Sequence, residues 1–180
     1  MTRQTTWIAL LRGINVGKAK RVAMADLRAI VESLGYTDAR TLLNSGNVVF
    51  RGTAGNPLTV AARLEAALLE RTGVESRIAV LTAAELAMAL DANPLGVPDD
   101  PARFLVACFV DASTAERARP LAKQRWDPDR FAIEGRVAWL WCATGILESP
   151  LVKAFGRATG DTATTRNWTT MTKLRVLAAG

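Results

Sequence analysis

The sequence contains no histidine, and it has only two cysteines, one tyrosine and five lysines. Without histidine, catalytic triads that need an imidazole and metal sites that need histidine ligands are excluded. Cys108 and Cys142 are too few for a disulfide framework. Any catalytic group would have to be an acid, a lysine, a hydroxyl, a thiol or Tyr36. We expect no metal and no resident cofactor.

Long apolar runs are also missing. No stretch approaches the ~18 residues that a membrane-spanning helix needs. Only four apolar residues follow Trp7 in a row, without a small-residue cleavage site, which argues against a secretory signal. The 49% hydrophobic and 22% charged residues are typical of a globular protein with a core. We therefore expect a cytoplasmic protein.

Positive charge is in excess. The net charge is +6 and the pI is about 10.0, which favours an anionic partner such as a phosphate compound or a nucleic acid. Only five of the 23 cations are lysines, and with the abundant alanine this indicates that a high-GC coding bias raises the pI in part. Beyond residue 150, five cations accompany a single acid, Asp161.

The first half of the chain predicts a compact β and α pattern. A β-run at residues 7–12 leads through a long loop at residues 13–22 into a helix at residues 24–34, with Gly35 at a typical stop position. Further strands are expected at residues 40–43, 48–51 and 76–81, and a second helix at residues 57–71. The order βαββαβ predicts an α+β, ferredoxin-like arrangement.

The second half predicts a reduced copy of the first. Thr82 and Glu85 form a capping box for a connecting helix, which the sequence NPLGVPDDP ends. Strands at 104–110, 131–134 and 137–141, helices opened by Ser113 and by Ser149, and a last helix at 170–178 follow. The reduced order is βαββα before the last helix. We expect an internal duplication: a half at residues 1–81, a connection at 82–100 and a half at 101–180.

Topology brings two loops together. In a βαββαβ unit the first two strands run in the same direction, because a right-handed crossover joins them. The loop GINVGK and the turn NSGN therefore meet at one edge of the sheet, where the turn at residues 72–75 also returns. We call residues 13–21 and 44–47 the rim. Backbone N–H groups and cations at such an edge are suited to an anion.

The rim matches neither of two common nucleotide-binding motifs. Gly13 and Gly17-Lys18 are one residue too close for the phosphate loop of ATPases, and Ala19 stands where that loop has a hydroxyl. The pattern also differs from the dinucleotide fingerprint. A solvated loop and an ordinary tight hairpin remain open as structural interpretations.

The functional interpretation assigns roles to five polar residues in or next to the rim. Arg12 and Lys18 would supply charge, and Asn15, Ser45 and Asn47 would read the hydrogen-bonding edge of a ligand. Arg166 and Asn167 precede the last helix, for which Thr169 or Thr170 is the expected cap, and could form an additional anion fork. Trp139 and Trp141 share one strand face, where core packing or an interface between the two halves is favoured over base stacking. Both cysteines are expected in the core.

The motifs LLRGINVGK, SGNVVF and TTRNW, in this order, resemble a bacterial family of unknown function, DUF1697. The resemblance covers nearly the whole chain and implies a duplicated ferredoxin-like α+β fold, but no reaction. Its signature positions in this chain are Arg12, Gly13, Asn15, Gly17, Ser45, Gly46, Asn47, Arg166, Asn167 and Trp168. Where the family pattern resembles GIGRSKL, this chain has GILESPL, and Glu148 and Pro150 replace two expected cations.

Three functional hypotheses follow. The first is a cytoplasmic binding protein that holds a nucleotide, a phosphate compound or a nucleic acid at the rim. The second is an enzyme of unknown reaction in the same place, with Lys18 or Ser45 as the reactive group. The third is an interaction module or homodimer without a small ligand.

Overall fold

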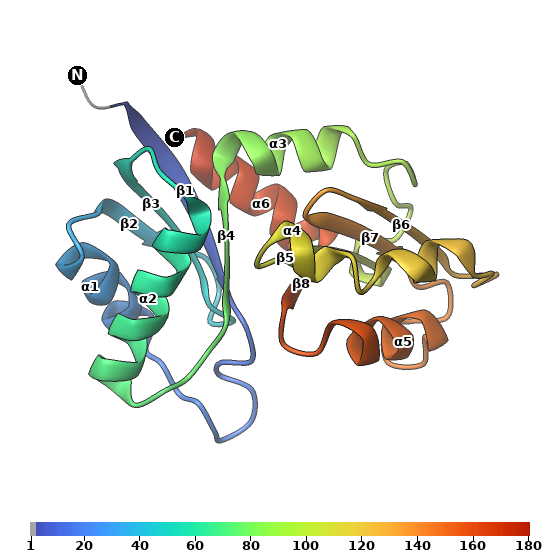
Figure 1. Cartoon of the computed structure of the whole chain (residues 1–180), viewed down its shortest axis with the longest axis horizontal. Coiled ribbons are helices and arrows are strands. Elements are labelled where there is room, and N and C mark those ends of the chain that lie inside the picture. Colours follow the sequence, from blue (N-terminus) through green and yellow to red (C-terminus); the bar gives the residue numbers. More distant parts are fainter. Residues whose placement is uncertain (1–2) are drawn as a thin grey trace. The chain divides into compact units, whose positions relative to one another are not determined.

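The computed structural model describes residues 3–180, which divide into two units (Figure 1). Unit 1 comprises Met1–Ala87 and Leu174–Gly180, and unit 2 comprises Met88–Lys173. The boundaries fall inside helices α3 (Ala83–Asp91) and α6 (Trp168–Ala179), so the last residues of the chain belong to unit 1. No helix within residues 3–180 is long and apolar enough to cross a membrane.

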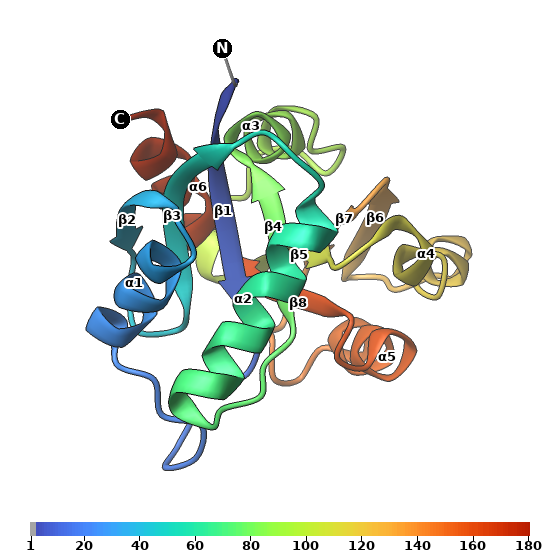
Figure 2. The same cartoon turned by 60° about the vertical axis from the view of Figure 1, so that its left-hand side comes forward.

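Unit 1 has the predicted βαββαβ order. Its elements are β1 (Gln4–Leu11), α1 (Met24–Ser33), β2 (Thr37–Thr41), β3 (Asn47–Thr53), α2 (Pro57–Thr72) and β4 (Ile78–Thr82). The sheet order is β2-β3-β1-β4, with every neighbouring pair antiparallel. Figure 2 shows α1 and α2 on one face of this sheet. The ferredoxin-like prediction is therefore confirmed.

The core of unit 1 forms between the sheet and these two helices. Alternate residues of β1, such as Trp7 and Leu11, face the helices because strand side chains alternate between faces. Leu27 and Val31 of α1 recur at helical spacing and are buried with them. Residues from β3, α2 and β4 complete the same cluster.

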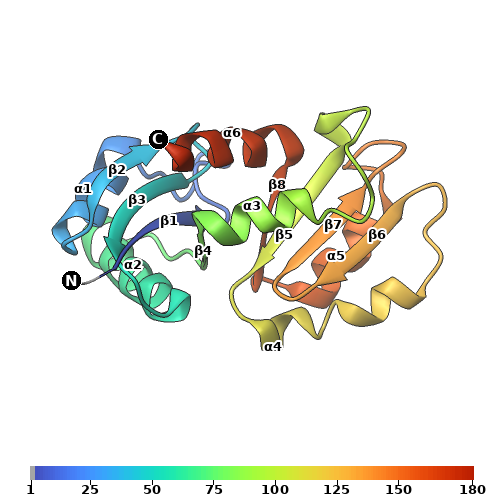
Figure 3. The same cartoon turned by 90° about the horizontal axis from the view of Figure 1, so that it is seen from above.

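Unit 2 repeats this plan. Its elements are the 3₁₀ turn η1 (Pro101–Arg103), β5 (Phe104–Phe109), α4 (Ala112–Ala115), the 3₁₀ turn η2 (Arg119–Lys123), β6 (Arg130–Glu134), β7 (Val137–Trp141), α5 (Pro150–Thr159) and β8 (Ala163–Asn167). Its antiparallel sheet has the order β6-β7-β5-β8, which Figure 3 shows from above. The α+β class and the internal duplication are confirmed.

The second copy is complete rather than reduced. Strand β8 pairs with β5 over five residues and supplies the strand that the sequence analysis missed. Its sequence, ATTRN, lacks the alternation of apolar and polar residues that marks a strand, although threonine is a good strand former. Residues 163–167 form a strand because they pair with β5, although their local sequence pattern does not predict one.

Helix starts agree with the sequence in some cases and not in others. Thr82 and Glu85 form the expected capping box, and Ser149 caps α5. Helix α4 is capped by Asp111, whose carboxylate accepts the Thr114 N–H at 2.8 Å, and not opened by Ser113. Helix α6 begins after Asn167, which accepts the Thr170 N–H at 2.9 Å, and not after a threonine.

The tryptophans and cysteines on strands are mainly core residues. Trp7 and Trp139 are buried, and the Trp139 indole N–H donates to the Ala89 carbonyl at 3.2 Å. Cys108 and Cys142 are both buried and free. Burial raises the pKa of the Cys142 thiol to about 11, so this thiol stays protonated at neutral pH.

Candidate functional site: the rim of unit 1

Three segments of unit 1 meet where β1 and β2 end. These two strands are both antiparallel to β3, so they run in the same direction, and Figure 2 shows the connecting segments at the same end of the sheet. The Leu11 N–H donates to the Gly46 carbonyl at 2.8 Å, and the Arg12 N–H donates to the Arg77 carbonyl at 3.0 Å. The predicted meeting of the loop with the NSGN turn is confirmed.

Asn15 holds the long loop in shape. Its amide nitrogen donates to the carbonyls of Val22 at 2.8 Å and Asn44 at 2.7 Å, and its amide oxygen accepts the Val22 N–H at 2.9 Å. Both amide hydrogens are therefore used inside the protein. The sequence analysis assigned Asn15 to ligand readout, whereas the structure gives it the task of joining the loop to the turn.

Asn47 has a similar task in the turn. It is fully buried, and its amide nitrogen donates to the Leu42 carbonyl at 2.8 Å and to Ser45 Oγ at 3.0 Å. Gly46, with φ +84°, packs against the loop: a Cβ atom here would lie 2.8 Å from Leu11 Cβ and from Ile14 Cδ1. Only glycine fits this position, so the SGN motif shapes the turn from within.

The backbone of the loop alternates between positive and negative φ. Gly13, Asn15 and Gly17 have φ values of 67°, 54° and 62°, whereas Ile14 and Val16 between them have negative φ. Alternating handedness of this kind directs successive N–H groups into a concavity that attracts anions. The N–H groups of Gly13, Ile14, Val16 and Gly17 donate no hydrogen bond to any acceptor in residues 3–180.

Strained backbone gathers at the same place. Four non-glycine residues within residues 3–180 have positive φ. Asn15 and Lys20 lie in the rim, and Leu43 directly precedes its second segment; Asp38 is the exception. Such residues cost free energy and persist where the surrounding structure holds them, often at ligand sites.

The rim carries positive charge without acids of its own. Neither residues 12–21 nor residues 42–47 contain an acidic residue. Lys18 and Arg21 are exposed and form no ion pair with residues 3–180. Lys20 is also exposed, but its ammonium donates to the Glu75 carbonyl at 2.9 Å and ties the loop to the segment before β4.

A hollow of about 440 Å³ lies beside these cations. Its lining consists of Asn15, Arg21, Val22, Ala23, Met24 and Asn44. Helix α1 starts in this lining, with Ala23 as N-cap and no side chain bonded to its first turn. The open N–H groups of a helix start carry partial positive charge, which adds to that of Arg21. Asp26 in the first turn is the nearest opposing charge along the helix.

Unit 2 shows that the fold does not require this rim. Between β5 and α4 it has two residues, 110–111, where unit 1 has residues 12–23 between β1 and α1. Between β6 and β7 it has residues 135–136, where unit 1 has residues 42–46 between β2 and β3. The βαββαβ order therefore closes in unit 2 without the added length, the glycines and the cations that unit 1 has.

Arg166 and Asn167 lie in unit 2, whereas the other predicted site residues lie in unit 1. Asn167 is the cap of α6, as described above. Burial lowers the pKa of the Arg166 guanidinium to about 10, and Nη1 donates to the Thr165 carbonyl at 2.9 Å. Arg166 stays charged at neutral pH.

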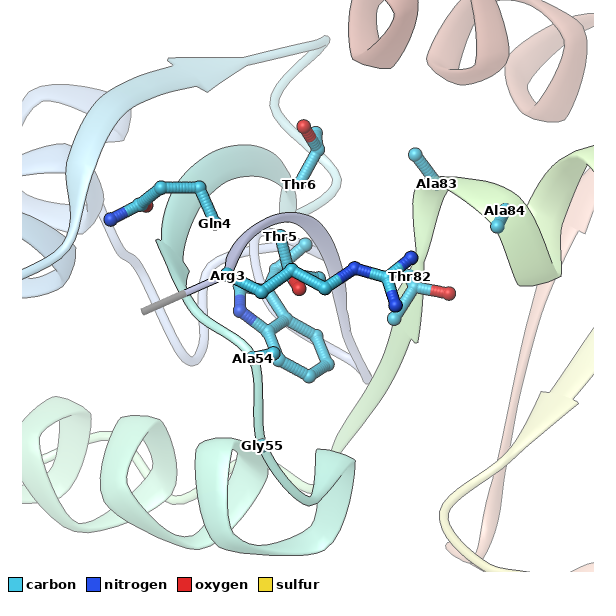
Figure 4. A pocket seen from close by; sticks show the side chains of 10 residues that line it. Arg3, Gln4, Thr5, Thr6, Ala54, Gly55, Thr82, Ala83 and Ala84 are labelled. Atoms are coloured by element: carbon cyan, nitrogen blue, oxygen red, sulfur yellow. The ribbon is translucent and has the colours of Figure 1, made fainter. Parts of the chain in front are cut away.

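A second hollow, of about 420 Å³, lies at the opposite end of β1 (Figure 4). Residues 3–7, 54–55 and 82–84 line it, and the sequence analysis did not single out any of them for a site. The Trp7 indole nitrogen is buried there without an acceptor in residues 3–180. Arg3 is the only cation in the lining, and the Glu85 carboxylate accepts the neighbouring Thr82 N–H. This hollow therefore lacks the charge of the rim.

No metal chemistry is indicated by the side chains. Within residues 3–180, no group of three or more histidine, cysteine, aspartate or glutamate residues could hold a metal ion.

Comparison with known proteins gives a family and a fold, but no activity. The family model described as "Protein of unknown function (DUF1697)" matches residues 4–139. No curated protein sequence matches the chain. The solved structure of the conserved bacterial protein SP0830 from Streptococcus pneumoniae is similar with a TM-score of 0.71 and 19% identity, over 98% of this chain and 99% of that chain. The similarity to SP0830 covers both units and shows the fold alone. The chain belongs to the DUF1697 family.

Proposed function

We propose that the rim of unit 1 binds a phosphate-bearing anion, with a nucleotide, a phosphate compound or a nucleic acid as the source of the phosphate. One observation carries this proposal: the same fold in unit 2 is closed by two-residue connections, while unit 1 builds a cationic, glycine-rich loop and a hollow in the equivalent place. The protein would work in the cytoplasm, where two buried free cysteines are typical.

Each part of the rim has a distinct task in this proposal. Lys18 and Arg21 attract the anion, and Arg12 adds charge at the end of β1. The N–H groups of Gly13, Ile14, Val16 and Gly17 and those at the start of α1 bind phosphate oxygens, as backbone donors do in other phosphate sites. Asn15 and Asn47 keep the two segments in register, so they act on the ligand only through the shape of the site.

An enzyme that uses Lys18 or Ser45 stays an alternative hypothesis. No histidine is available as a base, and the Ser45 hydroxyl accepts a hydrogen bond from Asn47. Because these observations support turn geometry better than nucleophilic chemistry, binding is the stronger proposal.

Thermal shift and calorimetry on the full chain test the proposal, with inorganic phosphate, nucleoside di- and triphosphates, and a single-stranded oligonucleotide as probes. Oligonucleotide binding is measured at about 50 mM and about 200 mM salt, because phosphate contacts weaken steeply with salt. We expect stabilisation by at least one probe.

Charge reversal then locates the site. Lys18→Glu and Arg21→Glu should each weaken binding by roughly tenfold. Lys123→Glu is the matched control, because Lys123 is an exposed lysine of unit 2 and is not a rim residue. The proposal fails if no probe binds, or if Lys123→Glu weakens binding as much as the rim variants do.

A further inference from the structure

Strand β6 forms an open edge of the sheet in unit 2. The sheet order β6-β7-β5-β8 puts it at one end, as Figure 3 shows. Its five residues, RFAIE, pair with β7 from Arg130↔Trp141 to Glu134↔Val137. On its other side, β6 pairs with no strand in residues 3–180. An open edge presents unpaired backbone donors and acceptors to a partner.

The register decides which groups face outward. The Phe109 N–H donates to the Arg136 carbonyl, so every second residue of β7 from Arg136 on turns its backbone groups toward β5. The intervening residues of β7, which include Trp139, turn theirs toward β6. On β6, the backbone groups of Arg130, Ala132 and Glu134 therefore bond to β7, while those of Phe131 and Ile133 point outward.

The equivalent edge in unit 1 is irregular, whereas β6 is not. Strand β2 has a register shift between Thr37 and Arg40, and Asp38 within it has φ 54°. Irregularities of this kind prevent edge strands from pairing with other chains. Strand β6 keeps a continuous register with β7 and contains no proline. The edge strand β6 of unit 2 is therefore regular, whereas the equivalent edge strand β2 of unit 1 is not.

The sequence of β6 is complementary to itself in an antiparallel orientation. Arg130 and Glu134 stand at its two ends, are exposed, and form no ion pair with residues 3–180. Phe131 and Ile133 are half-buried on either side of Ala132. A strand with one positive end and one negative end attracts an antiparallel copy of itself, while like-charged ends would repel it.

We propose that β6 pairs with β6 of a second copy of this chain, antiparallel and centred on Ala132, so that the two sheets join across a two-fold axis. Phe131 of each copy then lies opposite Ile133 of the other, and their outward N–H and C=O groups form four hydrogen bonds. Arg130 lies opposite Glu134 of the other copy, in a non-hydrogen-bonded pair where side chains approach closely. The interface is isologous and closed, so association stops at the dimer.

This contact is independent of the rim, and its strength is limited by its length. Five residues per strand bury less surface than a permanent dimer interface does. We therefore expect a reversible dimer with a dissociation constant of roughly 10 μM to 1 mM.

Charge-reversal variants of the full chain test the pairing of β6 with β6. Sedimentation velocity from about 5 μM to about 1 mM should show a monomer–dimer equilibrium. Arg130→Glu and Glu134→Arg should each weaken the dimer by roughly tenfold, because each places like charges opposite one another twice. The double variant R130E/E134R restores both pairs and should bring the dissociation constant back to within about threefold. Arg71→Glu, at an exposed position of α2 in unit 1, should leave it unchanged.

Amide hydrogen exchange identifies the contact residues. The Phe131 and Ile133 amides should exchange more slowly as the protein concentration rises, while those of Arg130, Ala132 and Glu134 should not change, since they already bond to β7. Circular dichroism checks that every variant folds. A protein that stays monomeric to about 1 mM, a dimer that the single reversals do not weaken, or one in which Phe131 gains no protection overturns the proposal.

Discussion

Units 1 and 2 have the same topology but extend opposite ends of it. Unit 1 has its long connections after β1 and after β2, at residues 12–23 and 42–46. Unit 2 has its long connections before β6 and after β7, at residues 124–129 and 142–149. The βαββαβ fold therefore tolerates longer connections at either end of the sheet. The polar groups of these connections differ between the two units.

The two long connections of unit 2 form hydrogen bonds with each other. Asp129 is buried, and its carboxylate accepts the Ala143 N–H at 2.9 Å and the Ser149 hydroxyl at 2.6 Å. Ser149 is also buried and caps α5. The rim of unit 1 instead leaves Lys18 and Arg21 exposed and several N–H groups without an internal acceptor. Unit 2 uses these polar groups for structure, whereas those of the rim stay available for the anion that we propose.

The largest expected effect is a loss of stability when a glycine is replaced in the connection between β2 and β3. The same change in the connection between β6 and β7 serves as the comparison. Gly46→Ala should destabilise unit 1 by roughly 2–5 kcal/mol, because the Cβ would lie 2.8 Å from Leu11 and Ile14 side-chain atoms at φ +84°. Gly135→Ala in the matching turn of unit 2 should cost only about 1–2 kcal/mol, since φ is +54° and no atom lies within 4 Å. Urea denaturation measures both. Equal losses of unfolding free energy in the two variants would mean that the loop at residues 13–21 and the turn at residues 44–47 are not tightly packed against each other.

The next effect concerns the tie between the loops of unit 2. Asp129→Ala removes the acceptor of the Ala143 N–H and of the Ser149 hydroxyl, so stability should fall by roughly 2–4 kcal/mol. Asp129→Asn keeps one acceptor oxygen and should cost less. Phosphate binding at the rim should survive in both variants under conditions where they are folded. Loss of binding in a folded Asp129 variant would contradict the separation of roles between the units.

The third prediction concerns helix capping, which differs between the two units. Asp111 caps α4 in unit 2, while Ala23 leaves α1 in unit 1 without a cap. Ala23→Asp and Ala23→Ser should both stabilise the protein by roughly 0.5–1 kcal/mol, because both residues are good caps. Ala23→Asp should weaken phosphate binding by roughly tenfold, since it adds a carboxylate to the lining of the hollow, whereas Ala23→Ser changes no charge. Calorimetry with inorganic phosphate distinguishes them, and equal affinities would remove the start of α1 from the site.

The sequence predicts the rim better than it predicts the roles of its residues. The loop and the turn meet because strand direction is fixed by the βαββαβ order, and apolar periodicity reveals that order. The task of Asn47 depends on its burial at the start of β3, which no local pattern shows. Strand β8 was missed because its polar sequence becomes a strand only by pairing with β5. The missing cap at Ala23, beside the hollow, is a finding of the structure that the sequence analysis did not single out.

The smallest expected effect is a pH dependence confined to unit 2. The Ser113 hydroxyl and the Thr114 N–H donate hydrogen bonds to the Asp111 carboxylate and hold its pKa below the usual range of an aspartate. A carboxyl with a lowered folded-state pKa stabilises the protein above its unfolded-state pKa, and this stabilisation is lost as the pH falls through the folded-state value. Asp111 is partly exposed, so solvent reduces the effect to well below about 1 kcal/mol. Denaturation at pH 7 and near pH 3 should show a smaller acid-induced loss in Asp111→Asn than in the natural sequence, because asparagine also caps helices but does not titrate. Identical losses in the two proteins would mean that the α4 cap does not contribute through its charge, and that unit 2 differs from unit 1 at this position only in hydrogen bonding.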